Sequence, residues 1–221
     1  LMSKASSQVA QLGLQYVHND TCYPALLIIG QFIEALQSGR YDLSSTALAI
    51  TQSGGGCRAS NYIKLLRKAL DQAGFEQIPV ISFNFSGLEK DMSMKLTAKL
   101  IAKLVAAVEY GDLIDSLYHE CRAYEVNQGD ARRKTVEWLD QVSGWLLQEK
   151  NLKIREMKEM FPVIVNDFAR VPLQRTQKLK VGIVGEIYVK FSPLGNRDLV
   201  RFLEQQDCEV RLPGLMGYIE Y

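Results

Sequence analysis

The first part of the chain alternates short strand-like apolar runs with segments of helical periodicity. The strand-like runs are residues 14–17, 46–51 and 78–85, and the helical segments between them are residues 24–37 and 59–73. Short links join these segments, and Gly39 and Gly74 follow the two helical ones. This order predicts a parallel sheet of three strands with right-handed crossovers over residues 8–87.

The pattern changes after Gly87, where helical periodicity takes over. Helices are expected over residues 95–108, 113–122, 130–149 and 153–169, with a kink or a break into two helices at Pro162. The expected buried stripes are Leu96, Leu100, Leu104 and Ala107, then Val136, Leu139, Val142 and Leu146, then Met157, Phe161, Ile164 and Phe168. Residues 92–170 are therefore predicted to form a helical block inserted after the first sheet.

A basic linker that contains proline, residues 171–178, leads to a second group of strand and helix signals. The pattern predicts a strand at residues 181–186, a helix at residues 196–206 and a strand at residues 209–212. We interpret this as the opening βαβ unit of a second α/β domain, residues 179–221, too short to bury its own core. The first domain is then residues 8–170, and we expect the chain to be a fragment of a longer protein.

Composition and charge exclude several classes of function. The chain has 221 residues and a formal net charge of +1, which does not indicate a nucleic-acid-binding surface. No apolar run approaches the roughly 20 residues that cross a bilayer, and no signal peptide is visible. The four cysteines are too sparse for a disulfide scaffold. We expect a cytoplasmic protein that binds neither nucleic acid nor membrane and forms no structural disulfide.

A glycine-rich loop, Ser53-Gly54-Gly55-Gly56-Cys57-Arg58, follows the second strand-like run and precedes a helix. Glycines let the backbone turn sharply and approach a ligand, and a helix start offers unpaired N–H groups. Ser53, Gly54, Gly55, Gly56 and Arg58 are therefore expected to contact an anionic group, which could be a phosphate, a carboxylate or a thiolate-bound metal cluster. The loop lacks both the GxGxxG fingerprint and the Gly-Lys-Ser/Thr ending of a P-loop, which disfavours nucleotide binding. The structural alternative is a tight turn.

Cys22 and Cys57 each lie where a strand-like run is followed by a helix start. In open α/β sheets ligands bind at the edge where strands end, and a thiol at a helix N-terminus ionises more readily. The two cysteines are therefore a candidate metal site. The alternative is that both are buried as small apolar residues, which is common for free cysteine. Cys121 and Cys208 are expected to be structural.

Three stretches carry a resemblance to a known family. Residues 19–25 (NDTCYPA), 51–62 (TQSGGGCRASNY) and 180–190 (KVGIVGEIYVK) resemble the C-terminal part of large bacterial proteins related to CoA-substrate-specific enzyme activases. Those proteins fuse activase-type ATPase domains to a module similar to the 2-hydroxyacyl-CoA (2-hydroxyglutaryl-CoA) dehydratase component D family. The resemblance covers essentially the whole chain, and it implies a multidomain, Rossmann-like fold with a three-layer parallel sheet.

The resemblance also implies a [4Fe-4S] or related iron–sulfur cluster, held by three cysteines at a junction of α/β domains. Cys22 and Cys57 match two of these ligand positions, and the third is expected beyond Tyr221. Cys121 and Cys208 do not match it. The implied partners are the activase-type ATPase domains of the same long chain.

The chemistry implied by the resemblance is ATP-driven, low-potential electron transfer to a CoA-thioester or another small substrate. Our leading hypothesis is an iron–sulfur module of a dehydratase-like or reductase-like enzyme, without a cluster or turnover as an isolated fragment and with no catalytic residue assigned. The alternative is a non-catalytic scaffold or docking module of the fused activase protein. A nucleotide-binding Rossmann domain is a third, weaker hypothesis.

Overall fold

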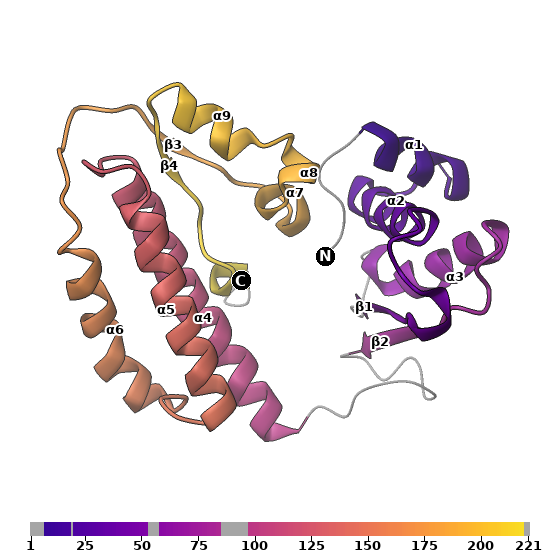
Figure 1. Cartoon of the computed structure of the whole chain (residues 1–221), viewed down its shortest axis with the longest axis horizontal. Helices are drawn as coiled ribbons and strands as arrows, with labels where there is room; N and C mark the ends of the chain where they lie inside the picture. The colour runs from indigo at the N-terminus through magenta and orange to yellow at the C-terminus, as the bar shows by residue number, and fades with distance from the viewer. Residues whose placement is uncertain (1–6, 19, 53–57, 85–96, 219–221) are drawn as a thin grey trace. The chain divides into compact units, whose positions relative to one another are not determined.

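The computed structural model describes residues 7–18, 20–52, 58–84 and 97–218 (Figure 1). Contacts between α-carbons divide the chain into two compact units. The N-terminal unit comprises residues 1–96 together with 191–197, and the helical unit comprises residues 97–190 together with 198–221.

The described part of the N-terminal unit is a small parallel strand pair with helices around it. Its elements are α1 (Ser7–Tyr16), α2 (Tyr23–Gln37), the 3-10 helix η1 (Leu43–Ser45), β1 (Leu48–Gln52), the 3-10 helix η2 (Arg58–Asn61), α3 (Tyr62–Gln72), β2 (Val80–Asn84) and α8 (Pro193–Asn196). β1 pairs with β2 in parallel, with Leu48 opposite Val80 and Gln52 opposite Asn84. The chain crosses from one strand to the other through α3, as a parallel pair requires. The predicted second and third strands and the helix between them are therefore confirmed.

The strand predicted at residues 14–17 is wrong, because this segment is the end of α1 and the turn after it. Val9, Gly13 and Val17 are all buried, and their spacing of four residues places them on one face of a helix. Within the described residues the sheet of this unit has the strands β1 and β2 alone, so a three-stranded sheet over residues 8–87 is not formed there.

Two glycines allow α1 and α2 to pack backbone against backbone. A Cβ atom added to Gly30 would lie 2.1 Å from the backbone oxygen of Val9, and one added to Gly13 would lie 2.2 Å from the backbone oxygen of Leu26. No larger residue fits at either position unless the helices move apart. α2 itself is almost entirely buried along its length, which makes it the central helix of this unit.

The helical unit consists of long helices and a second, shorter strand pair. Its elements are α4 (Ala98–Arg122), α5 (Asp130–Gln148), α6 (Ile154–Phe168), β3 (Lys180–Gly182), α7 (Ile187–Phe191), α9 (Leu199–Gln205), β4 (Glu209–Arg211) and the 3-10 helix η3 (Met216–Tyr218). The predicted helices are confirmed, and the first two of them form the single helix α4. α6 runs through Pro162 without interruption, so the alternative of two shorter helices is wrong. The buried residues Met157 and Ile164, on either side of the proline, anchor both halves of α6 to the same core.

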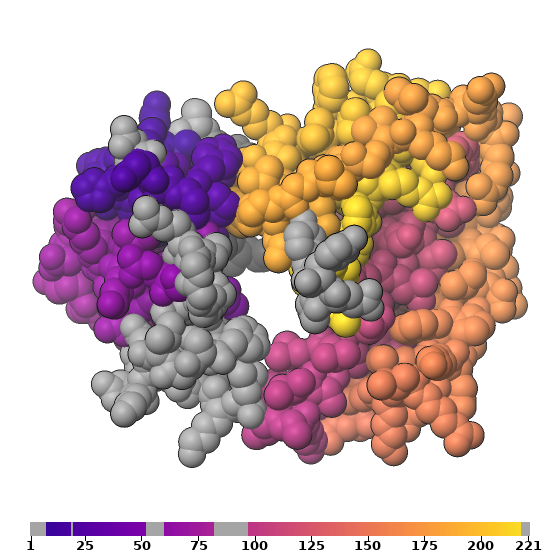
Figure 2. All heavy atoms as spheres, turned by 180° about the vertical axis from the view of Figure 1, so that it is seen from behind, coloured from indigo at the N-terminus to yellow at the C-terminus, as the bar shows by residue number. Residues whose placement is uncertain are grey.

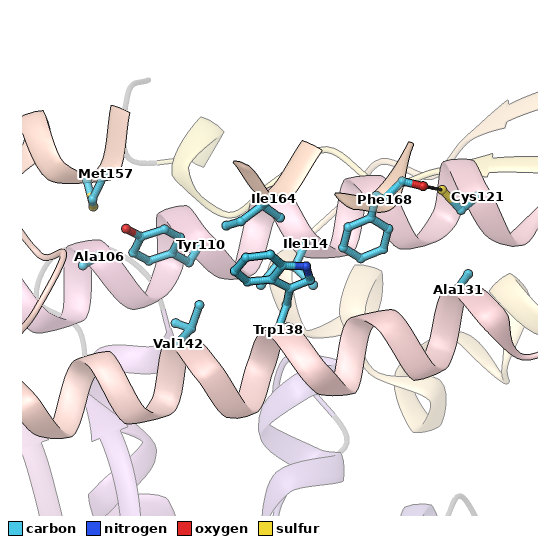
Figure 3. Close-up of a cluster of buried hydrophobic side chains, with 10 residues drawn as sticks. All are labelled: Ala106, Tyr110, Ile114, Cys121, Ala131, Trp138, Val142, Met157, Ile164 and Phe168. Carbon is cyan, nitrogen blue, oxygen red and sulfur yellow. Dashed lines mark hydrogen bonds between the residues drawn. The ribbon is translucent and has the colours of Figure 1, made fainter. Parts of the chain in front are cut away.

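The core of this unit lies between α4, α5 and α6 and is rich in aromatic rings (Figure 3). The ring of Tyr110 meets those of Trp145 and Phe161 edge to face, with centroids 5.4 Å and 5.5 Å apart. Met157, Ile164 and Phe168 of the predicted α6 stripe are buried there, as expected. The predicted stripes of α4 and α5 are partly wrong: Leu104, Val136 and Leu139 are between 43% and 50% exposed. The core positions are Ala106, Tyr110 and Ile114 on α4 and Ala131, Trp138 and Val142 on α5, of which Val142 alone was predicted.

β3 and β4 form a parallel pair, with Lys180 opposite Glu209, which confirms the predicted βαβ order of the C-terminal segment. β4 packs on α4, so the helical block and this strand pair belong to one unit. This grouping differs from the expected one, in which the block belonged with the first sheet. The structure shows a mostly helical chain of mixed α/β type, and the described residues do not show a three-layer parallel sheet. Among the described helices, none is both long and apolar enough to span a membrane.

Candidate functional site

Cys22 lies at the N-cap of α2, with Pro24 in the first turn of that helix. Its side chain is half-buried and makes no capping hydrogen bond to the helix. Instead, the Cys22 Sγ atom lies 3.5 Å from the hydroxyl oxygen of Tyr62, within hydrogen-bonding distance. The thiol is therefore directed away from its own helix and toward the start of α3.

The contact with Tyr62 brings together segments that are 40 residues apart in sequence. Tyr62 is the first residue of α3, and η2 separates it from the glycine-rich loop. Cys22 thus lies close to the chain that follows the loop. It follows α1 and a turn, in which the Thr21 N–H donates to the His18 carbonyl at 3.0 Å, and not the strand that was predicted before it.

The glycine-rich loop itself falls almost entirely outside the described residues. This holds for Ser53, Gly54, Gly55, Gly56 and Cys57, so their proposed contacts with a cluster stay predictions. Arg58 begins η2, between the end of β1 and the start of α3. The loop therefore lies in sequence between the C-terminal end of β1 and the start of η2 and α3. In α/β sheets, ligands are expected to bind at the edge where the strands end.

The other two described cysteines lie in the helical unit and are buried. The Cys121 thiol donates to the backbone oxygen of Phe168 at 3.9 Å (Figure 3), and burial raises its pKa. The Cys208 thiol, just before β4, donates to the backbone oxygen of Gln206 at 3.7 Å. These contacts are those of structural cysteines, as expected. Cys22, Cys121 and Cys208 are all free thiols.

The donor set can be compared with the needs of a cubane cluster, which takes three or four thiolates. Among the residues that the structure describes, no three His, Cys, Asp or Glu side chains gather in a way that could hold a metal ion. At the candidate site the described residues offer the single thiol of Cys22. By themselves these residues do not fit a cubane.

The segment that follows β3, which includes Gly185, Glu186 and Ser192, contains two helix caps. The Glu186 carboxylate accepts the N–H groups of Tyr188 and Val189 at 2.8 Å and 3.0 Å. The Ser192 hydroxyl accepts the N–H of Gly195 at 3.3 Å, which caps α8. The polar side chains of Glu186 and Ser192 therefore cap helices in this segment.

Sequence reasoning missed a cluster of ionisable side chains on one face of α4. Asp112, Asp115 and His119 follow the spacing of a helix face, which was the signal available in the sequence. The two ring nitrogens of His119 lie 3.6 Å from Asp115 Oδ1 and 3.8 Å from Glu204 Oε1. Burial raises the pKa of Asp115, and burial lowers the pKa of Lys190, on which the charges of Asp112 and Asp115 also act.

Comparison of the chain with protein-family models, curated proteins and solved structures finds no match in any of the three. A function can therefore be inferred only from the residues described above and from the sequence resemblance.

The described thiols are expected to differ strongly in reactivity. In the native protein Cys22 should react with a small maleimide at least about tenfold faster than Cys121 or Cys208, because Cys22 is partly exposed, the other two are buried, and access controls thiol reactivity. Mass spectrometry of peptides after timed quenching measures all of these rates in one sample. Rates that become equal only in urea support the assignment, whereas a native Cys121 as reactive as Cys22 contradicts it.

Proposed function

We propose that this chain is an α/β module of an iron–sulfur protein that takes part in ATP-driven, low-potential electron transfer to a CoA-thioester or another small substrate. The observation that carries the proposal is the position of Cys22. Its thiol lies at the start of α2 and makes no capping hydrogen bond to that helix. It contacts Tyr62, at the start of the helix that follows the glycine-rich loop.

In this proposal Cys22 and Cys57 supply two thiolate ligands of a [4Fe-4S] or related cluster. The backbone N–H groups of Gly55 to Arg58 would donate hydrogen bonds to it, and the Tyr62 hydroxyl can donate to the Cys22 sulfur. Such hydrogen bonds stabilise negative charge on sulfur and adjust the reduction potential. A cluster in this place would supply one-electron chemistry at low potential.

The remaining parts of the proposal follow from the resemblance. They are a Rossmann-like domain with a three-layer parallel sheet, a third cysteine ligand beyond Tyr221, and ATPase domains of the activase type in the same long chain. The parallel β1–β2 pair with its α3 crossover supports the fold.

Anaerobic reconstitution with iron and sulfide tests the ligand count. The 221-residue chain should keep no stable cluster after desalting, because two thiolates leave a cubane exposed to solvent and oxygen. A stable brown protein with about four irons per chain would contradict this expectation. A longer polypeptide that includes the remaining ligand should hold iron, and it should lose the iron in Cys22→Ser but not in the matched variant Cys208→Ser.

The alternative function is a scaffold or docking module without a cluster. It is favoured by the well-packed aromatic core of the helical unit, which is built as a stable helical framework. Iron analysis of the longer polypeptide, purified without oxygen, separates the two functions. A colourless, iron-free protein that is otherwise folded would support the scaffold and would contradict the iron–sulfur proposal.

A further inference from the structure

A C-terminal segment of the helical unit, residues 212–217, is held on α4 by polar anchors; we refer to it as the strap. The Asp112 carboxylate accepts the backbone N–H groups of Leu215 and Met216, one on each oxygen, both at 2.8 Å. The Lys190 amino group donates to the backbone oxygen of Pro213 at 2.6 Å. The yellow C-terminal segment can be followed along the helical unit in Figure 2. The strap is thus bonded to both α4 and α7.

Gly214 of the strap lies close to the Asp112 side chain of α4. A Cβ atom added to Gly214 would lie 2.5 Å from Asp112 Oδ2. A larger residue there would displace either the Asp112 carboxylate or the strap, and would weaken the hydrogen bonds between them.

Burial of apolar side chains contributes little to this attachment. Pro213 and Gly217 are exposed, and the other four strap residues, Leu215 and Met216 among them, are only partly buried. A segment with few buried apolar contacts and a few polar anchors opens at a lower free energy than the core beneath it.

Closing the strap has an opposing cost, because Lys190 lies beneath it. Lys190 is only 2% exposed. The negative charges of Asp112 and Asp115 favour its charged ammonium form. Burying an ammonium group is unfavourable unless carboxylates and hydrogen bonds compensate for the lost hydration. The free energy gained from the hydrogen bonds of the strap is therefore opposed by the cost of desolvating the Lys190 ammonium group.

We propose that the strap is a conformational latch, which opens as a local unit while α4 and the β3–β4 pair stay folded. Opening exposes the Lys190 amino group and the Asp112 carboxylate to solvent. The proposal is independent of the iron–sulfur function, since it involves only the helical unit.

Amide hydrogen exchange tests local opening directly. In the wild-type chain the N–H groups of Leu215 and Met216 should exchange faster than those of the α4 core, such as Ile114, and should respond little to low urea. Asp112→Asn leaves one acceptor oxygen for two N–H donors, so their exchange should accelerate by about tenfold or more. Asp140→Asn, an exposed position on α5, is the matched control and should change nothing in the strap.

Acylation of lysine by a small succinimidyl ester gives a second measurement. Lys190 should be modified faster in Asp112→Asn and in Gly214→Ala, while the exposed Lys158 on α6 should keep its rate in all variants. Strap amides that exchange only with global unfolding would overturn the proposal. So would variants that keep the slow wild-type modification of Lys190, or a pair of variants that both unfold the entire helical unit.

Discussion

Phe168→Ala is expected to lower the free energy of unfolding of the helical unit by about 3–5 kcal/mol, the usual cost of removing a fully buried phenylalanine ring. Phe168 has no exposed surface, and its ring lies between α4, α5 and α6 (Figure 3). Alanine would leave a cavity that these long helices can close only in part. Urea unfolding followed by tryptophan fluorescence measures the effect, because Trp138 and Trp145 both lie on α5.

Phe202→Ala is the matched control, since Phe202 lies on α9 in the same unit and is 56% exposed. Its loss should change the free energy of unfolding by no more than about 0.5 kcal/mol. Equal losses in the two variants would show that the aromatic core does not dominate the stability of this unit.

Gly30→Ala is expected to destabilise the N-terminal unit by about 1–3 kcal/mol, as overpacking of a closely packed contact does. The added methyl group would meet the backbone oxygen of Val9 at 2.1 Å, so α1 and α2 must separate. The loss outweighs the gain in helix propensity, which is about 1 kcal/mol for alanine over glycine. Far-UV circular dichroism in urea and hydrogen exchange of the α1 amides report the change.

Gly111→Ala is the control with the opposite expected sign. Gly111 lies inside α4, and a Cβ atom there would have no neighbour within 4 Å. Alanine should therefore stabilise the helical unit by about 0.5–1 kcal/mol. A stabilising effect of Gly30→Ala, alongside that of Gly111→Ala, would show that α1 and α2 are not in backbone contact.

The sequence of α4 shows how a helical apolar pattern can predict the wrong buried face. α4 carries apolar residues on more than one side, so its sequence allows several stripes, and the stripe through Leu104 was the wrong one. The side that packs on α5 and α6 runs through Ala106, Tyr110 and Ile114. Asp112, Asp115 and His119 occupy another side, which receives the strap and α9. Which sides of such a helix are buried depends on the elements that pack against it.

Periodicity alone was sufficient for elements whose signal is local and long. The helices α2, α3, α5 and α6 repeat apolar residues at helical spacing over three or more turns, and Gly39 and Gly74, with positive φ angles of 67° and 76°, follow α2 and α3. The parallel pairing of β1 with β2 also followed from the order of the elements. Residues 14–17 were too few to separate a strand from the last turn of a helix, and only the spacing of Val9, Gly13 and Val17 resolves that ambiguity.

Contacts between distant segments depended on the tertiary structure. The contact of Cys22 with Tyr62 spans 40 residues, and the bonds from Asp112 to Leu215 and Met216 span more than 100. A local sequence pattern predicts which residues share a helix face, but it does not predict which segment packs against that face. The packing partners are determined by steric fit, because a close-packed interior allows few arrangements of the same elements. The glycine contacts between α1 and α2 and between the strap and α4 are examples of such fit.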